Sequence, residues 1–238
     1  MQGDPASGAP PSLLGTTIRR SVVVGRVYLV VGTLLSIFYS VVLSLASGDA
    51  FATAGPLLLP ILAVVGGLGG LLVFTNDRLK GVLEYLIAYG YAPRSLFLNV
   101  VGATIVLVSI VLASSTVAGI AAFVATGHAV TVSLVAALAI YTVPMSYASA
   151  SFAATAGIFW TSLSSPREGM NSPIGLIPVV GVAPPLLTLV AVSVADVTGA
   201  VPILATMGLA VGIVVAIVAV LLAFMSRLMH RERLLSPT

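Results

Sequence analysis

The sequence predicts an all-α integral membrane protein with six transmembrane helices. Hydrophobic residues make up 59% of its 238 residues and charged residues only 7%, whereas a soluble domain carries about 25% charged residues. Six apolar stretches are each long enough to cross a bilayer core of about 30 Å, which needs roughly 20 helical residues. These runs are too long and uniform for the alternating strands of a barrel, so every span is expected to be a helix.

Three regions follow one another along the chain. Residues 1–12 are rich in Gly, Pro, Ala and Ser, and this composition predicts a disordered cytoplasmic tail. Residues 13–226 form the predicted transmembrane domain, and residues 227–238 form a cytoplasmic C-terminal tail. The first apolar run is much longer than the roughly 7–15 residues of a signal peptide's apolar region, so we interpret it as a span. The predicted spans are Val22–Ala46, Pro56–Thr75, Ser95–Ala125, Ala129–Ser162, Ile174–Ala195 and Pro202–Ser226.

The basic residues predict the orientation of these spans. All ten lie in alternate gaps or at the edges of those gaps, and the three intervening gaps contain no Lys or Arg. Cytoplasmic loops carry the Lys/Arg excess in membrane proteins, so both termini are expected in the cytoplasm of a cell-membrane protein. The ten residues are Arg19, Arg20, Arg26, Arg78, Lys80, Arg94, Arg167, Arg227, Arg231 and Arg233.

The gaps and the small residues predict how the spans pack. The outer gaps Ser47–Gly55, Thr126–His128 and Asp196–Val201 are too short for an extracellular domain. Pro144 is expected to kink the fourth span, because proline removes a backbone donor. The fifth span contains Pro178, Pro184 and Pro185, which is compatible with a kinked helix or with a broken one that lines a cavity. Small residues at four-residue spacing predict close helix contacts, and they are Gly66 with Gly70 and Ser149 with Ala153 and Gly157.

The chain lacks the residues and motifs that several classes of function require. No Asp, Glu, Lys or Arg lies deep in a predicted span, which argues against a proton-driven pump. The single lysine, Lys80, follows Leu79 and precedes Gly81, so the chain lacks a phosphate-cradling Gly-Lys-Ser/Thr loop. It has no metal-ligand cluster, and its net charge of +3 reflects topology rather than nucleic-acid binding. We therefore expect no catalytic residue, no metal and no cofactor in this chain.

The segment between spans two and three predicts a separate amphipathic helix over residues 77–89. Asn76 suits its N-cap, Gly90 its C-cap, and Pro93 blocks its continuation. Lys80 and Glu84 are spaced as an i,i+4 pair. The residues Leu79, Val82, Leu83, Leu86 and Ile87 recur at helical spacing and predict one apolar face. Such a helix could lie on the inner membrane surface or in the groove of a cytoplasmic partner.

This segment, with six spans and cytoplasmic termini, resembles a known family. The pattern D-R-x-x-G-x-L-E-Y-L-x-x-Y-G-Y-x-P-R resembles the first cytoplasmic loop of permease subunits of ATP-binding cassette transporters. The resemblance is to the exporter-like class whose ATPase is a separate subunit. Residues 13–26 are similar to the elbow helix that precedes span one in that family. One departure is the short gap between spans five and six, which in many members is larger.

The resemblance implies a coupling helix that docks on an ATP-binding cassette ATPase. That partner would bind ATP and Mg. A second permease copy or a homologue would lie beside this chain. The implied docking residues are Asp77, Arg78, Lys80, Gly81, Leu83, Glu84, Leu86, Gly90, Pro93 and Arg94. The implied substrate path would use Ser36, Tyr39 and Ser40 of span one. Two alternatives stay open, a non-transporting membrane anchor or assembly subunit and a secondary transporter.

Overall fold

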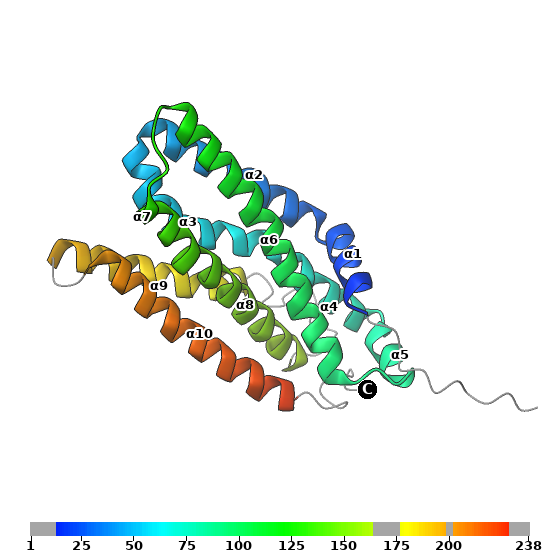
Figure 1. Cartoon of the computed structure of the whole chain (residues 1–238). Helices are drawn as coiled ribbons and strands as arrows, with labels where there is room; N and C mark the ends of the chain where they lie inside the picture. Colours follow the sequence, from blue (N-terminus) through cyan, green and yellow to red (C-terminus); the bar gives the residue numbers. More distant parts are fainter. Residues whose placement is uncertain (1–12, 164–176, 199–201, 229–238) are drawn as a thin grey trace, which may run out of the picture.

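The computed structural model describes residues 13–163, 177–198 and 202–228, and all regular structure within them is helical. The long helices run side by side as an elongated bundle (Figure 1). The predicted disordered tail, Arg167 and residues 229–238 lie outside the described residues. The elements are α1 Leu14–Val24, α2 Arg26–Ala46, α3 Gly48–Gly67, α4 Gly69–Leu79, α5 Val82–Ala88, α6 Pro93–Ala125, α7 Val132–Ala137, the π-helix η1 Leu138–Thr142, α8 Val143–Leu163, α9 Ile177–Thr198 and α10 Ile203–Leu228.

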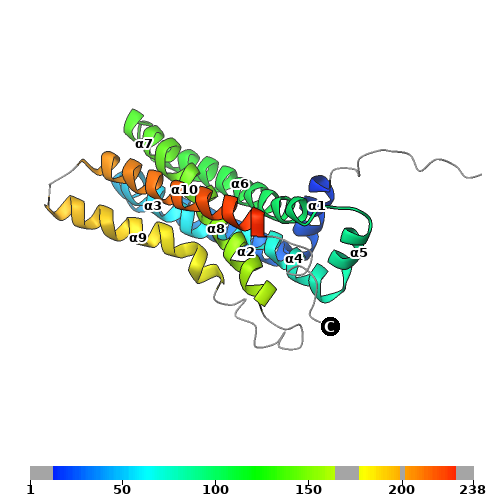
Figure 2. The same cartoon turned by 90° about the horizontal axis from the view of Figure 1, so that it is seen from below.

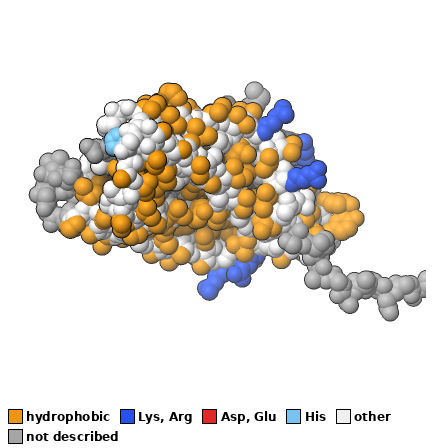
Figure 3. Space-filling model, turned by 45° about the horizontal axis from the view of Figure 1, so that its top comes forward, with side chains coloured by type: hydrophobic (Ala, Val, Ile, Leu, Met, Phe, Trp, Pro, Cys, Tyr) orange, Lys and Arg blue, Asp and Glu red, His pale blue; other side chains and the backbone are white. Residues whose placement is uncertain are grey.

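Five helical stretches are long and apolar enough to cross a membrane. They are Arg26–Ala46, Ala50–Leu79, Pro93–Ala125, Val132–Trp160 and Ile203–Leu228. In the fifth predicted span, α9 is helical from Ile177 to Thr198, but its fully described apolar part, Val180–Val194, is shorter than the other five. Hydrophobic side chains are spread over the visible face, as expected of a surface that contacts lipid (Figure 3). The protein is therefore a multi-pass membrane protein by the length and apolarity of its helices.

The described basic residues gather at one end of the bundle, which we call the basic end. It is formed by α1, the α4–α5 turn, the start of α6 and the last turn of α10, and these lie together in both views (Figures 1 and 2). The opposite end is formed by the α2–α3 turn, residues 126–131, the end of α9 and the start of α10. The described Lys and Arg residues at the basic end are Arg19, Arg20, Arg26, Arg78, Lys80, Arg94 and Arg227.

The first span begins later than predicted. Gly25, with φ −90° and ψ 10°, separates α1 from α2, so the span starts at Arg26 rather than Val22. A separate helix α1 therefore occupies the place of the expected elbow helix. The predicted outer gap Ser47–Gly55 is wrong, because Ser47 caps α3 by accepting a hydrogen bond from the Ala50 N–H at 3.0 Å and the chain becomes helical at Gly48.

Pairs of glycines bring α1 and α2 into backbone contact with α3 and α4. A Cβ built on Gly25 would lie 2.2 Å from the Gly69 Cα, and one built on Gly32 would lie 2.7 Å from the Gly66 Cα. No side chain fits at either crossing. On the other side of the same segment, Gly70 lies against Thr104 of α6. The spacing predicted a close helix contact without saying whether it lies within one chain or between two, and the structure forms this contact within one chain.

A second small-residue surface lies between α8 and α9. A Cβ on Gly181 would lie 2.7 Å from the Ala153 Cβ and 2.8 Å from a Val64 methyl group. Despite Pro184 and Pro185, α9 is continuous, so the fifth predicted span is not broken within the described residues. Thr188 donates a hydrogen bond to the Pro184 carbonyl at 2.9 Å within the same helix.

The proline-distorted regions of α3 and the fourth span meet at a hydrogen bond. Pro60 has no N–H, so the carbonyl of Pro56 loses its ordinary α-helical donor. Thr142 Oγ1 donates to that carbonyl at 3.0 Å from the last residue of η1. Pro144 was expected to kink the fourth span, and the distortion takes the form of a π-helical segment just before it. Thr142 is 1% exposed, so a neighbouring helix satisfies this carbonyl in place of water.

Candidate functional site

The segment between the second and third spans differs from the predicted continuous helix over 77–89. α4 extends the second span to Leu79, so Asn76 is not an N-cap and Asp77 belongs to α4 rather than to a separate helix. The chain then turns at Lys80 and Gly81, where Gly81 has φ +69°. This left-handed conformation suits glycine, and it ends α4 before α5 begins at Val82. The separate helix is α5, with seven residues.

The C-terminal end of α5 follows the sequence expectation. Gly90 has φ +93°, its N–H donates to Ile87 at 3.0 Å, and the Tyr91 N–H donates to Leu86 at 3.1 Å. This pair of bonds is a Schellman motif. Pro93 then opens α6 at its first residue, and Arg94 follows it on the surface. The connection from α5 into the third span is therefore short and fully hydrogen-bonded at the helix end.

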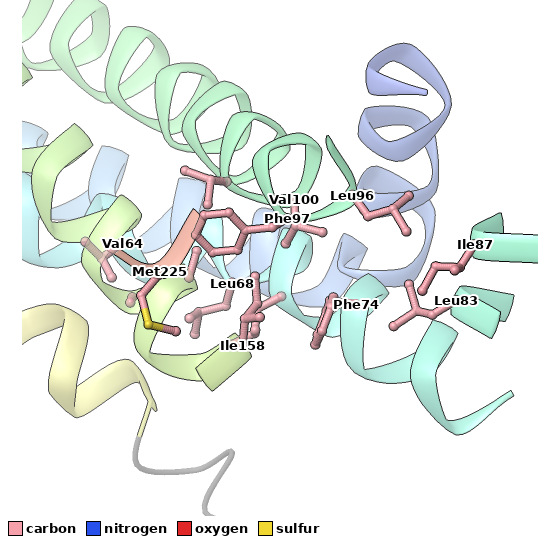
Figure 4. Packing of buried hydrophobic residues seen from close by; sticks show 14 residues of the cluster. Val64, Leu68, Phe74, Leu83, Ile87, Leu96, Phe97, Val100, Ile158 and Met225 are labelled. Atoms are coloured by element: carbon pink, nitrogen blue, oxygen red, sulfur yellow. The ribbon is translucent and has the colours of Figure 1, made fainter. Parts of the chain in front are cut away.

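The apolar side of α5 packs against the protein itself. Leu83 and Ile87 are 4% and 5% exposed, and they belong to one cluster with Phe74 of α4 and Leu96 of α6. Figure 4 shows both α5 side chains directed toward those two residues. Leu86 is partly buried beside the same cluster, whereas Leu79 is 56% exposed. The predicted single apolar face is therefore wrong at Leu79. Leu83 and Ile87 are covered by the protein itself, and Val82 and Leu86 are partly exposed.

An ion pair fixes α1 to the end of α4 beside α5. Arg20 Nη1 donates to Asp77 Oδ2 at 2.8 Å, and Arg20 Nη2 donates to Asp77 Oδ1. The Asp77 side chain is 7% exposed and that of Arg20 37%. Both residues line a cavity of about 110 Å³ between α1, α4, α5 and α6. The next residue, Arg78, is also buried. Asp77, the first residue of the predicted docking motif, thus pairs with α1 of the same chain, and Arg78 beside it is buried.

The outward side of α5 carries the accessible residues of the motif. Glu84 and the next residue, Tyr85, are exposed, and Tyr89 is exposed one turn after Tyr85. Tyr85 donates a hydrogen bond to the Tyr89 hydroxyl at 2.8 Å, and their ring centroids are 4.6 Å apart. This bond raises the pKa of Tyr85 above its ordinary value, because it stabilises the protonated hydroxyl. The result is an aromatic pair beside a carboxylate, which we call the α5 face and define as Glu84, Tyr85 and Tyr89.

The predicted Lys80–Glu84 pair is not formed within the described residues. Lys80 lies in the turn before α5, so the two side chains do not share a helix. The Glu84 carboxylate instead lies near Gly81, with Oε2 3.7 Å from where a Cβ would stand. Glu84 is therefore exposed at the surface of the basic end.

The three predicted path residues do not share one surface. Ser36 and Ser40 are 0% and 1% exposed on the side of α2 that carries Gly32 and Ser44, whereas Tyr39 is 45% exposed. Ser44 Oγ donates to the Gly119 carbonyl of α6 at 3.0 Å, which shows that this side of α2 faces α6. Ser36 and Ser40 thus lie in a packing contact, and Tyr39 lies on the outside of the bundle.

No protein-family model, curated protein or solved structure matches this chain.

Two features of the site were missed by sequence reasoning. The sequence pattern presents Arg20 only as a topology signal, although it is the partner of Asp77; a separation of 57 positions gives no local sign of that pairing. Tyr85 and Tyr89 stand at i,i+4 spacing, which would have indicated that their rings meet on one side of a helix.

Proposed function

We propose that this chain is the permease subunit of an ATP-binding cassette transporter, an exporter in the cell membrane with both termini in the cytoplasm and six spans, α9 being the fifth. A separate cytoplasmic ATPase subunit, which binds ATP and Mg, docks at the α5 face. A second permease copy or a homologue completes the transporter. The chain itself is not an enzyme and supplies the path through the membrane.

The α5 face is the observation that supports this proposal. α5 is a short helix at the basic end whose apolar side is already buried, so its outward side offers Glu84, Tyr85 and Tyr89 to a soluble partner. Tyrosine is enriched at interfaces because it combines apolar area with a hydrogen-bonding tip. The Lys/Arg rule predicts that this face lies in the cytoplasm, where an ATPase would meet it.

The connections of α5 suit the transmission of a movement. α5 joins the second and third spans through two short turns and contacts both through Leu83 and Ile87. The Arg20–Asp77 pair adds α1 to the same unit. A partner that binds one orientation of α5 more tightly would thereby favour one arrangement of the spans. Coupling between two sites requires such a difference in binding free energy.

Purification of the tagged chain from its native membrane in mild detergent, followed by mass spectrometry, tests the proposal. The expected result is an ATP-binding cassette ATPase in stoichiometric amount. A clean preparation without such a subunit would overturn it.

A non-transporting anchor or assembly subunit is the second candidate, and the buried positions of Ser36 and Ser40 favour it. The chain has no cysteine, so Ser36→Cys gives a single-cysteine protein without further changes. If the chain is a permease, ATP should change the rate of maleimide labelling at position 36 of this variant when its ATPase is bound. An unchanged rate, with an ATPase bound, would favour the anchor.

A further inference from the structure

A cavity of about 540 Å³ lies at the end opposite the basic end, where α3, α7, α9 and α10 meet. Its volume falls within the range of about 300–1,000 Å³ typical of small-molecule sites. Small side chains help to keep it open, since Ala52 and Ala54 of α3 and Ala137 of α7 stand on its wall. Four separate elements line this space, which is open on one side, so it is more than a gap between two neighbouring helices.

The lining is apolar except for three hydroxyl side chains. These are Thr53 on α3, Ser133 on α7 and Ser193 on α9, and the described lining residues include no charged group. Ser193 Oγ donates to the Leu189 carbonyl at 2.9 Å within α9. Ser133 Oγ lies 3.0 Å from Thr131 Oγ1. A hydroxyl has one donor and two acceptor lone pairs, so the hydroxyl of Ser193 still offers acceptor capacity to a ligand after this bond is made.

We propose that this cavity binds a neutral amphiphile whose apolar body lies against α10 and whose head group donates hydrogen bonds to Ser133 and Ser193. A charged ligand does not suit the site, because no opposite charge in the described lining would compensate its desolvation. The hydroxyls distinguish a donor-bearing ligand from a plain hydrocarbon. This site is separate from the α5 face and does not depend on an ATPase.

Two sources could supply such a molecule, a membrane lipid with an uncharged hydroxyl head or a diffusible amphiphile. Lipid extraction from the purified chain separates them. A neutral hydroxyl lipid that is retained by the wild-type protein and lost from the Ser133→Ala/Ser193→Ala variant identifies the lipid. Saturable binding of added amphiphile without a retained lipid identifies the diffusible source. Both results support the site.

Photolabelling of the purified chain in lipid nanodiscs with a diazirine-bearing octanol tests the proposal directly. The expected label falls on peptides covering residues 52–57, 133–137 and 203–207, and 1-octanol competes for it better than a methyl ether of equal length. Ser193→Ala weakens competition roughly 2- to 10-fold, the effect of one lost hydrogen bond. Ser114→Ala is the matched control, because Ser114 also bonds to its own helix but lies on α6 outside the cavity.

A second variant tests the space itself. Ala54→Phe fills the cavity and should reduce labelling at least 10-fold, whereas Val132→Phe on α7, at an 87% exposed residue outside the lining, should not. If Ala54→Phe fails to fold, Ser193→Ala still decides the question. Label spread evenly over α2 and α10, or equal competition by the ether, would overturn the proposal. The assay contains no ATPase, so its failure leaves the proposed function untouched.

Discussion

Arg20 and Asp77 are 57 positions apart in sequence, yet their side chains form a two-point ion pair that joins α1 to the last turn of α4. The carboxylate is almost fully buried, while the guanidinium is partly exposed. Asp77 stands four residues before Gly81, where the chain turns into α5. This pair therefore sets the position of the turn from which α5 begins.

Replacement of Arg20 should destabilise the protein more than replacement of both partners. Arg20→Met leaves the Asp77 carboxylate buried without its cation, and we expect a loss of about 1–3 kcal/mol in the free energy of unfolding. This range is below that of a fully buried pair, because solvent screens Arg20. Equilibrium unfolding in mixed micelles measures the loss. The Arg20→Met/Asp77→Asn double variant should recover part of it, and purely additive losses would contradict the pairing.

Gly25 should not accept even a methyl group. A Cβ there would lie 2.2 Å from the Gly69 Cα, which is backbone and cannot rotate away. Gly25→Ala should therefore cost about 2 kcal/mol or more through forced separation of the helices. Gly212→Ala in α10 is the matched control, because nothing lies within 4 Å of its added Cβ. Equal stability of the two variants in the same unfolding assay would show that this crossing is not tight.

The Thr142 hydroxyl should matter more than an ordinary helix hydroxyl. Thr142→Val leaves the Pro56 carbonyl without this donor, with an expected loss of about 0.6–1.7 kcal/mol. Thr155→Val provides the comparison, since Thr155 bonds to the Ser151 carbonyl of its own helix. Unfolding measurements that show a greater loss for Thr155→Val would argue against a special role for the inter-helix bond.

Charge reversal on the α5 face should weaken binding of the proposed ATPase. Glu84→Lys is expected to reduce co-purification roughly tenfold, because it alters the charge complementarity of the contact while the side chain stays outside the bundle. Quantitative mass spectrometry of the purified complex measures this change. Glu84→Gln, which removes the charge without reversing it, should have a smaller effect. Full ATPase binding and stimulation in Glu84→Lys would exclude Glu84 from the docking contact.

The two ends of the bundle should label from opposite sides of the membrane. In this cysteine-free chain, Val130→Cys adds a thiol at the end opposite the basic end, and Tyr89→Cys adds one at the α5 face. A membrane-impermeant maleimide should label Val130→Cys in intact cells and Tyr89→Cys only after permeabilisation. The reverse pattern would overturn both the orientation and the cytoplasmic docking proposal.

Long apolar helices could be predicted from the sequence because their signal is composition over about 20 residues. The third span illustrates this, since the prediction Ser95–Ala125 differs from α6 by two residues at one end. The end of α5 was also predictable, because Gly90 and Pro93 act on their immediate neighbours.

The errors come from residues whose conformation depends on distant partners. Ser47–Gly55 contains two glycines and one aspartate and resembles a loop, yet it extends a span that packs against α2 and α6. Asn76 and Asp77 resemble a helix start, but the preceding helix continues through them and Arg20 binds the carboxylate. Leu83 has the same helical spacing whether α5 lies on a membrane, in a partner or against its own chain. Its pattern could therefore not show that Phe74 lies in the same cluster.

The π-helix η1 has a consequence for the length of the fourth span. A π-helical segment accommodates one residue more than an α-helix would over the same path. Removal of Ala139 or Ile140, both exposed, would therefore let this stretch close as an ordinary α-helix without rotating α8 relative to α7. The same deletion in the middle of α6 would turn every later residue of that helix by about 100°. Among the described helices, η1 is thus the place where the deletion of one residue is best absorbed.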